Sequence, residues 1–281
     1  MSFDDLPAQP RMNEAGERYS AVALERSRAA AAETRCVLDI PYGPDYWQKL
    51  DVWLPPDAAG RDLPVLVFMH GGGWTRGYKE WCGFMAPALA ARGIILVSVS
   101  YRLIPHVAFP VPVQDCIAAL KWVADNITAH GGSTERIFAG GHSAGGQLAA
   151  LLALHGDWLE AAGVRGDIVR AVFCLSATFN RRMVDPEVAP DHVPPEPFEA
   201  IAPESPLALA DRARVPFYIA WGGNEHERLE RTGRQMVAAL EQRGVPVTWH
   251  VYPGYDHFDM HIELADPASH FTTTALAWMK G

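Results

Sequence analysis

The sequence lacks the segments that would place it in a membrane, in a secretory route or on a nucleic acid. No apolar run approaches the length of about 18 residues that a membrane span needs. Residues 1–10 contain two aspartates and no apolar stretch, so we do not expect a signal peptide. The 33 Asp and Glu outnumber the 24 Lys and Arg, and there is no basic run. We therefore expect no membrane and no nucleic-acid partner.

Cysteines and metal-ligand patterns are also scarce. The four cysteines are widely spaced, and Cys116 and Cys174 lie in apolar segments that predict buried free thiols. This usage fits a reducing compartment, and we expect a cytoplasmic location. The nearest approach to a metal-ligand cluster is His226 between Glu225 and Glu227, where a solvated turn is the favoured interpretation. The sequence thus predicts no metal and no cofactor.

Apolar runs alternate with helical patterns along most of the chain. The continuous runs are typical of buried parallel strands, and we expect strands at 64–70, 93–100, 136–140, 168–176, 215–221 and 247–252. Helices are expected at 11–34, 80–92, 111–129, 147–154, 229–243 and 267–280. Residues 36–40 and 48–54 alternate around turn residues, which predicts an antiparallel hairpin. The whole pattern predicts one α/β domain over 1–281, with a mostly parallel sheet and helices on both faces.

Two segments lie outside this alternation. Residues 1–34 are expected to form a helical extension that packs over the sheet edge or the site mouth. Between 178 and 212 seven prolines rule out long regular elements. Because the alternation resumes afterwards, we expect this insertion to be a lid over the site and not a linker.

A glycine-rich turn, Gly141–Gly146, joins an apolar strand to an apolar helix. Its Gly-His-Ser-Ala-Gly sequence matches the G-x-S-x-G nucleophile elbow, which presents a serine, here Ser143, on a strained turn. The small neighbours let strand and helix backbones approach closely, and the helix N-terminus favours a developing negative charge. The alternative is an ordinary glycine-rich turn with an incidental serine. The strand before it, the helix after it and the downstream partners favour the elbow.

A serine nucleophile needs a base, and the base needs an orienting acid. His257, between the last strand and the last helix, is the predicted base, and His261 is the alternative. Glu225, just after the strand at 215–221, is the predicted acid, and Glu227 is the alternative. Both glutamates could instead belong to a solvated turn ahead of a helix. The order serine, acid, histidine is that of the α/β-hydrolase arrangement.

The run His70–Trp74 spells His-Gly-Gly-Gly-Trp directly after a buried strand. Acyl transfer needs donors aimed at the tetrahedral oxyanion, and glycines let backbone N–H groups turn toward it. We expect the N–H groups of Gly72, Gly73 and Ala144 to form this oxyanion hole. His70 is expected to brace the loop instead of titrating. A phosphate-binding loop is the alternative, disfavoured because no G-K-[ST] and no G-x-G-x-x-G is present.

These segments together resemble the esterase/lipase superfamily of α/β-hydrolases whose members carry an H-G-G-x-W loop. The resemblance covers about residues 36–275 and rests on His70–Trp74, Tyr101-Arg102-Leu103, Gly141–Gly146 and Asp256-His257-Phe258-Asp259. Within the superfamily the chain is most similar to the arylformamidase (kynurenine formamidase) group and its bacterial carboxylesterase relatives. In that group the acid lies in a G-x-x-[DE] turn. Gly222–Glu225, followed by Leu229 and Arg231, matches that turn, which favours Glu225.

The sequence departs from the group at a few positions. Gly73 stands where formamidases usually have an aromatic residue, and Ser100 and His106 stand where the related pattern has acidic residues. The acid is a glutamate and not the commoner aspartate. These departures leave the substrate open, because Gly73 enlarges or reshapes the acyl pocket.

The resemblance implies a serine hydrolase of the α/β-hydrolase fold that cleaves a small ester or an N-formyl arylamide through an acyl-enzyme. The candidates for an apolar substrate pocket, each also a candidate core residue, are Trp74, Tyr78, Trp81 and Phe179. Two alternatives are a non-catalytic binding protein and a lyase on the same fold. The expected partner is a small ester or amide substrate, and the oligomeric state stays open, with a homodimer as one alternative.

Overall fold

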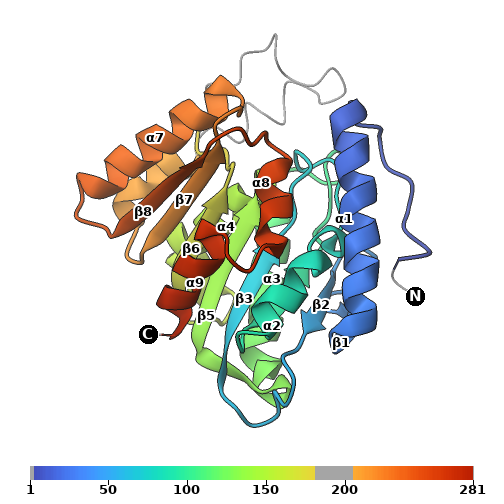
Figure 1. The fold of residues 1–281 in the computed structure, drawn as a ribbon. Helices are drawn as coiled ribbons and strands as arrows, with labels where there is room; N and C mark the ends of the chain where they lie inside the picture. The colour runs from blue at the N-terminus through green and yellow to red at the C-terminus, as the bar shows by residue number, and fades with distance from the viewer. Residues whose placement is uncertain (1–2, 181–204, 281) are drawn as a thin grey trace.

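A computed structural model describes residues 3–180 and 205–280. Its centre is an eight-stranded sheet in the order β1-β2-β4-β3-β5-β6-β7-β8 (Figure 1). The strands are β1 (Cys36–Pro41), β2 (Lys49–Trp53), β3 (Leu63–Met69), β4 (Ile95–Val99), β5 (Gly132–His142), β6 (Val169–Leu175), β7 (Phe217–Gly222) and β8 (Val247–Tyr252). β2 pairs antiparallel with β1 and with β4, and the other pairings are parallel. The expected mixed sheet with an N-terminal hairpin is confirmed.

Helices cover both faces of this sheet, because alternate side chains of each buried strand point to opposite sides. Val65 and Val67 of β3 join one apolar core, and Leu66 and Phe68 join the other. The first core packs against α3 (Val111–Asn126), α4 (Ala144–Leu154) and α7 (Glu227–Glu241). The second packs against α1 (Glu14–Glu33), α2 (Ala86–Ala90) and α9 (His270–Lys280). Figure 1 views the sheet from the side of α1, α2 and α9.

The prediction of one continuous helix at 80–92 is wrong. This stretch forms two 3-10 turns, η1 (Lys79–Trp81) and η2 (Gly83–Met85), and only then the short α2. Gly83 packs against Trp53, where an added Cβ would lie 2.4 Å from the indole ring. Pro87 fits only the first turn of a helix because it has no N–H to donate, so α2 begins anew at Ala86.

The remaining helices follow their expected positions with shifted ends. α1 starts after Asn13, whose side chain accepts a hydrogen bond from the Gly16 N–H. The helix expected at 111–129 ends at Asn126 and continues as the 3-10 turn η3 (Ile127–His130). Further short elements are α5 (Gly156–Ala161), η6 (Pro206–Arg212), α8 (Asp259–Ile262) and η7 (Glu263–Ala265).

Most of the stretch expected to be a lid lies outside the described residues. Of 178–212, only 178–180 and 205–212 are described. The lid and the single-domain organisation over 1–281 therefore stay predictions. Within the described ranges, no helix is both long and apolar enough to cross a bilayer.

Candidate active site

Ser143 lies between β5 and α4 on a strained turn. Its φ of 55° and ψ of −119° are unfavourable for a residue with a Cβ, so the surrounding packing must hold the turn. A Cβ at Gly141 would lie 2.2 Å from the carbonyl carbon of Gly145, so only glycine lets the strand pass the helix this closely. The Ser143 N–H donates to the Leu175 carbonyl at 2.8 Å, which ties the turn to the end of β6. The hydroxyl is thus presented at the carboxyl edge of the sheet.

His257 and Glu225 reach Ser143 from the loops after β8 and β7. The carboxyl ends of parallel strands share one edge of a sheet, which brings these distant segments together. His257 Nε2 lies 3.0 Å from Ser143 Oγ, and its Nδ1 lies 3.1 Å from both carboxylate oxygens of Glu225. A carboxylate only accepts, so Nδ1 carries the proton and Nε2 is left to accept the serine hydroxyl proton.

Glu225 is held as a carboxylate. Its side chain is fully buried, and burial opposes ionisation. The hydrogen bond and charge of His257, the nearby Ser176 hydroxyl and the His226 N–H outweigh this and lower the pKa of Glu225 to about 2. The alternative acid, Glu227, points to solvent with its side chain 89% exposed and pairs with Arg231 at 3.5 Å. The geometry therefore joins Glu225, and not Glu227, to His257.

The loop after β3 lies directly against the nucleophile. A Cβ at Gly71 would lie 3.2 Å from Ser143 Cβ. The next two residues, Gly72 and Gly73, have φ of 112° and 62°, which turns their peptide planes in a way that side chains disfavour. Ala144 is the first residue of α4, so the helix offers its N–H no carbonyl partner. Gly71 and Ala144 therefore adjoin Ser143, and an oxyanion hole formed by the N–H groups of Gly72, Gly73 and Ala144 stays a prediction.

His70 braces this loop. Its ring is buried, hydrogen-bonds through Nδ1 to the Gly71 carbonyl at 2.6 Å and stacks on Tyr101 at 4.3 Å. The Tyr101 hydroxyl donates to the His70 carbonyl at 2.9 Å. Burial lowers the pKa of His70 to about 4, so the ring is neutral near neutral pH.

The N-terminal segment supports the loop from outside. The side-chain amide of Gln9 donates to the Gly77 carbonyl at 3.0 Å and accepts from the Gly77 N–H at 2.8 Å. The Tyr78 hydroxyl donates to the Pro7 carbonyl, and Arg76 donates to the Arg11 carbonyl at 3.0 Å. These contacts fix the end of the loop against residues before α1.

The four aromatic candidates for substrate binding are mostly covered. Trp74 and Tyr78 are each 8% exposed, Trp81 is 2% exposed and Phe179 is fully buried. Trp74 and Phe179 join the core under α3 and α4, whereas Tyr78 and Trp81 join the core under α1. The four side chains therefore belong to two different cores, and their role in substrate binding stays a prediction.

Two residues near the site were not singled out from the sequence. His142 Nε2 lies 2.7 Å from the His257 carbonyl oxygen. Ser176 directly follows β6 and lies beside Glu225, with a φ of 45°. Its position at the carboxyl end of an expected strand was the only available signal. The alternative base, His261, is buried and pairs with the Tyr19 hydroxyl at 2.6 Å, so it serves the packing under α1.

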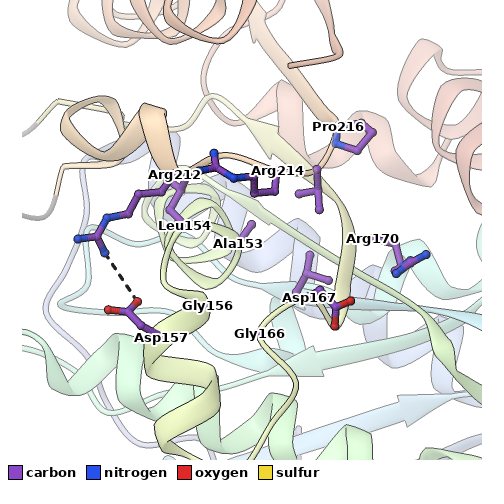
Figure 2. Close-up of a pocket in the computed structure, with 12 residues that line it drawn as sticks. Ala153, Leu154, Gly156, Asp157, Gly166, Asp167, Arg170, Arg212, Arg214 and Pro216 are labelled. Carbon is purple, nitrogen blue, oxygen red and sulfur yellow. Dashed lines mark ion pairs between the residues drawn. The ribbon is translucent and has the colours of Figure 1, made fainter. Parts of the chain in front are cut away.

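A pocket of about 690 Å³ lies away from Ser143 (Figure 2). It is bordered by the C-terminal end of α4 and the segments that lead into β6 and β7, including Arg170, Arg212 and Arg214. These positions belong to the opposite edge of the sheet from the ends that carry Ser143, Glu225 and His257. Figure 2 shows Arg212 reaching toward Asp157, with which it forms an ion pair at 3.7 Å.

The sheet and the position of the serine turn define the class: the protein is a serine hydrolase of the α/β-hydrolase fold. More narrowly, the chain belongs to the prolyl oligopeptidase family, whose model matches residues 110–281. The BD-FAE family model matches residues 50–167.

Named relatives place it among esterase and formamidase types. The chain is 26% identical to kynurenine formamidase of Salmo salar, over 99% of this chain and 97% of the relative. It is 39% identical to esterase LipC of Mycobacterium tuberculosis, over 40% of this chain and 28% of that one. These relatives confirm the resemblance to arylformamidases and esterases, so the chain is a hydrolase of esterase or formamidase type.

Solved structures agree with the fold. A putative thioesterase from silicibacter sp. tm1040 superposes with a TM-score of 0.78 at 25% identity, covering 100% of both chains. Esterase B from Lactobacillus Rhamnosis superposes with a TM-score of 0.73 at 20% identity, covering 94% of this chain and 91% of that one. The second likeness supports the fold alone.

Proposed function

We propose that the chain cleaves small carboxylic esters or N-formyl arylamides through an acyl-enzyme on Ser143. The observation that carries this proposal is the continuous hydrogen-bonded chain from Ser143 through His257 to the buried Glu225. A neutral histidine with Nδ1–H bonded to a carboxylate has a free Nε2 lone pair facing the hydroxyl, which is what a general base requires.

Each side chain then has one task. Ser143 Oγ attacks the substrate carbonyl while His257 Nε2 takes its proton, and the oxyanion is bound by the N–H groups of Gly72, Gly73 and Ala144. His257 returns the proton to the departing alcohol or arylamine, and the acyl group stays on Ser143. Water, deprotonated by His257, then releases the acid. Glu225 stays ionised throughout and stabilises the imidazolium, because its pKa is lowered to about 2.

The substrate class rests on the relatives and on the crowded surroundings of Ser143. The kynurenine formamidase of Salmo salar matches nearly the whole chain. Gly71 packs against the nucleophile, and Trp74 follows two residues after Gly72 with little exposed surface. Short acyl groups such as formyl or acetyl fit this arrangement better than long chains do.

A kinetic panel with a covalent probe tests the proposal. N-formylkynurenine is compared with p-nitrophenyl esters from acetyl to octanoyl, and a fluorophosphonate probe reports the reactive serine. We expect kcat/KM to fall beyond butyryl, and arylformamide turnover to match or exceed that of the best ester. A maximum at octanoyl would contradict the short-acyl proposal.

The same panel separates the alternatives. If the protein neither reacts with the probe nor turns over any substrate, it is a binding protein. If it turns over substrate in labelled water but the product contains no oxygen from that water, it is a lyase. Activity lost to a chelator and restored by a divalent ion would contradict the serine mechanism. The cytoplasmic location and the homodimer stay predictions, the second testable by light scattering.

A further inference from the structure

His142 contacts the main chain of the predicted base. Its Nε2 lies 2.7 Å from the carbonyl oxygen of His257, and the two rings are 4.7 Å apart. A carbonyl oxygen only accepts, so Nε2 carries the proton and donates it. Nδ1 is then bare, and it is buried with no hydrogen-bond partner in the described part of the chain. The tautomer of His142 is therefore set by His257.

The His142 ring is fixed by a second histidine and by α1. It stacks on His261 with ring centres 5.0 Å apart and an interplanar angle of 7°. His261 Nδ1 lies 2.6 Å from the hydroxyl of Tyr19, a residue of α1. Tyr19 also stacks on Phe258, the residue after His257, at 5.0 Å. Helix α1 thus contacts the segment after His257 at two residues, Phe258 and His261.

This group of rings stays uncharged around His257. His142 and His261 are 2% and 0% exposed. Burial, and then the charge of His257, lowers the pKa of His142 to about 3, and burial also lowers the pKa of His261. When His257 takes the serine proton, its histidine neighbours are therefore neutral and do not compete for that proton.

We propose that His142 is a positioning residue for His257, and that the pair formed by Tyr19 of α1 and His261 of α8 positions His142 in turn. The N–H of His142 fixes the main chain of residue 257, which keeps Nε2 within 3.0 Å of Ser143 Oγ and Nδ1 equidistant from the Glu225 oxygens. This inference rests on the proposed function, because it assigns a role relative to His257 as the base.

The test compares two substitutions at one position with a matched control. His142→Leu removes the donor, whereas His142→Gln keeps an amide N–H where Nε2 lies. The control is His155→Leu at the other end of α4, where His155 is 4% exposed and stacks on Trp158 at 4.1 Å. Each variant is assayed on p-nitrophenyl acetate, with proton NMR of the low-field Nδ1–H of His257 and with thermal unfolding.

We expect His142→Leu to lose about 10- to 100-fold in kcat with KM little changed, because a misplaced base costs rate and not binding. The low-field resonance should shift or broaden. His142→Gln should recover most of the rate and restore the resonance, and His155→Leu should leave both unchanged. Tyr19→Phe, which keeps the ring but loses the bond to His261, should lose a few-fold in kcat, and it carries the test if His142→Leu does not fold.

Two results would overturn the inference. One is a wild-type kcat in the folded His142→Leu variant. The other is a loss of kcat in His155→Leu as large as that in His142→Leu, with the His257 resonance unchanged in both variants. The proposed function is checked separately with Ser143→Ala. If that variant remains active, the proposed function fails. If it is inactive while His142→Leu is fully active, only the positioning role fails.

Discussion

The two edges of the central sheet differ in the strain of their backbone and in the burial of their charged side chains. At the carboxyl edge, Ser143 and Ser176 have φ of 55° and 45°, and Glu225 is buried beside His257. At the opposite edge, a pocket of about 690 Å³ is lined by arginines such as Arg212, whose side chain is 46% exposed. The strained and buried edge carries the candidate chemistry. Backbone strain and fixed orientation therefore indicate the reactive site better than the size of a cavity does.

Helix α4 runs between these edges, and its dipole explains part of the contrast. Its positive N-terminus adjoins Ser143, where a negative oxyanion would form. Its negative C-terminus adjoins His155 and Arg212, which lie 3.5 Å apart. One helix thus favours an anion at the carboxyl edge and cations at the other.

The largest expected effect separates two serines of the same strand-turn unit. Ser143→Ala should lower kcat by about 10³- to 10⁶-fold without unfolding the protein, since the members of a triad act as a unit. Ser133→Ala, at the opposite end of β5, should keep wild-type turnover because Ser133 accepts a hydrogen bond from the Glu135 N–H, far along the strand from Ser143. Steady-state kinetics on one ester measure both. Equal activity of the two variants would remove Ser143 as the nucleophile.

The next effect separates the two glutamates. Glu225→Gln should lower kcat by about 10²- to 10⁴-fold, because an amide cannot orient and stabilise the imidazolium as a carboxylate does. Glu227→Gln should change kcat by less than about twofold, as expected for a solvated side chain. The comparison uses the same ester assay at fixed pH. The reverse ranking would make Glu227 the acid.

Acid should destabilise the protein through the buried histidines at the carboxyl edge. The pKa of His70 is lowered from 6.5 to about 4, and that of His142 to about 3. Between these values and 6.5 the unfolded chain binds more protons, so stability falls as pH falls. For His70 the loss is about 3 kcal/mol. Urea unfolding at several pH values from 7 to 4.5 measures how steeply the free energy of unfolding falls with pH. His142→Gln should make this dependence less steep. An unchanged dependence would show that His142 does not contribute.

The smallest effect is expected at the opposite edge. Arg212→Ala removes an exposed ion pair with Asp157, which is worth about 0–1 kcal/mol. We expect kcat/KM to stay within about twofold of wild type, since Arg212 lies with the described pocket residues at the sheet edge opposite Ser143. Ester kinetics and thermal unfolding check both values. A large loss of kcat would show that the two edges are coupled.

The fold, and the segments that meet around Ser143, could be predicted because their signals are local. Buried parallel strands are continuous apolar runs, and the Ser143 turn lies within six residues between a strand and a helix. The prediction of one helix at 80–92 was wrong because Gly83 packs on Trp53, a contact that the local sequence pattern does not contain. The contact of His142 with His257 spans 115 positions, so only the folded chain reveals it.

The pairing of Gln9 with Gly77 joins segments 68 positions apart, and the Ser143–His257 bond joins segments 114 apart. Regular helices and strands do not depend on either contact, whereas turnover depends on the loop and the base that they fix. Local opening of the N-terminal segment requires less free energy than unfolding of the sheet. On gradual warming, catalytic turnover should therefore be lost at a lower temperature than the circular dichroism signal of the helices. Loss of activity would then report local opening before global unfolding begins.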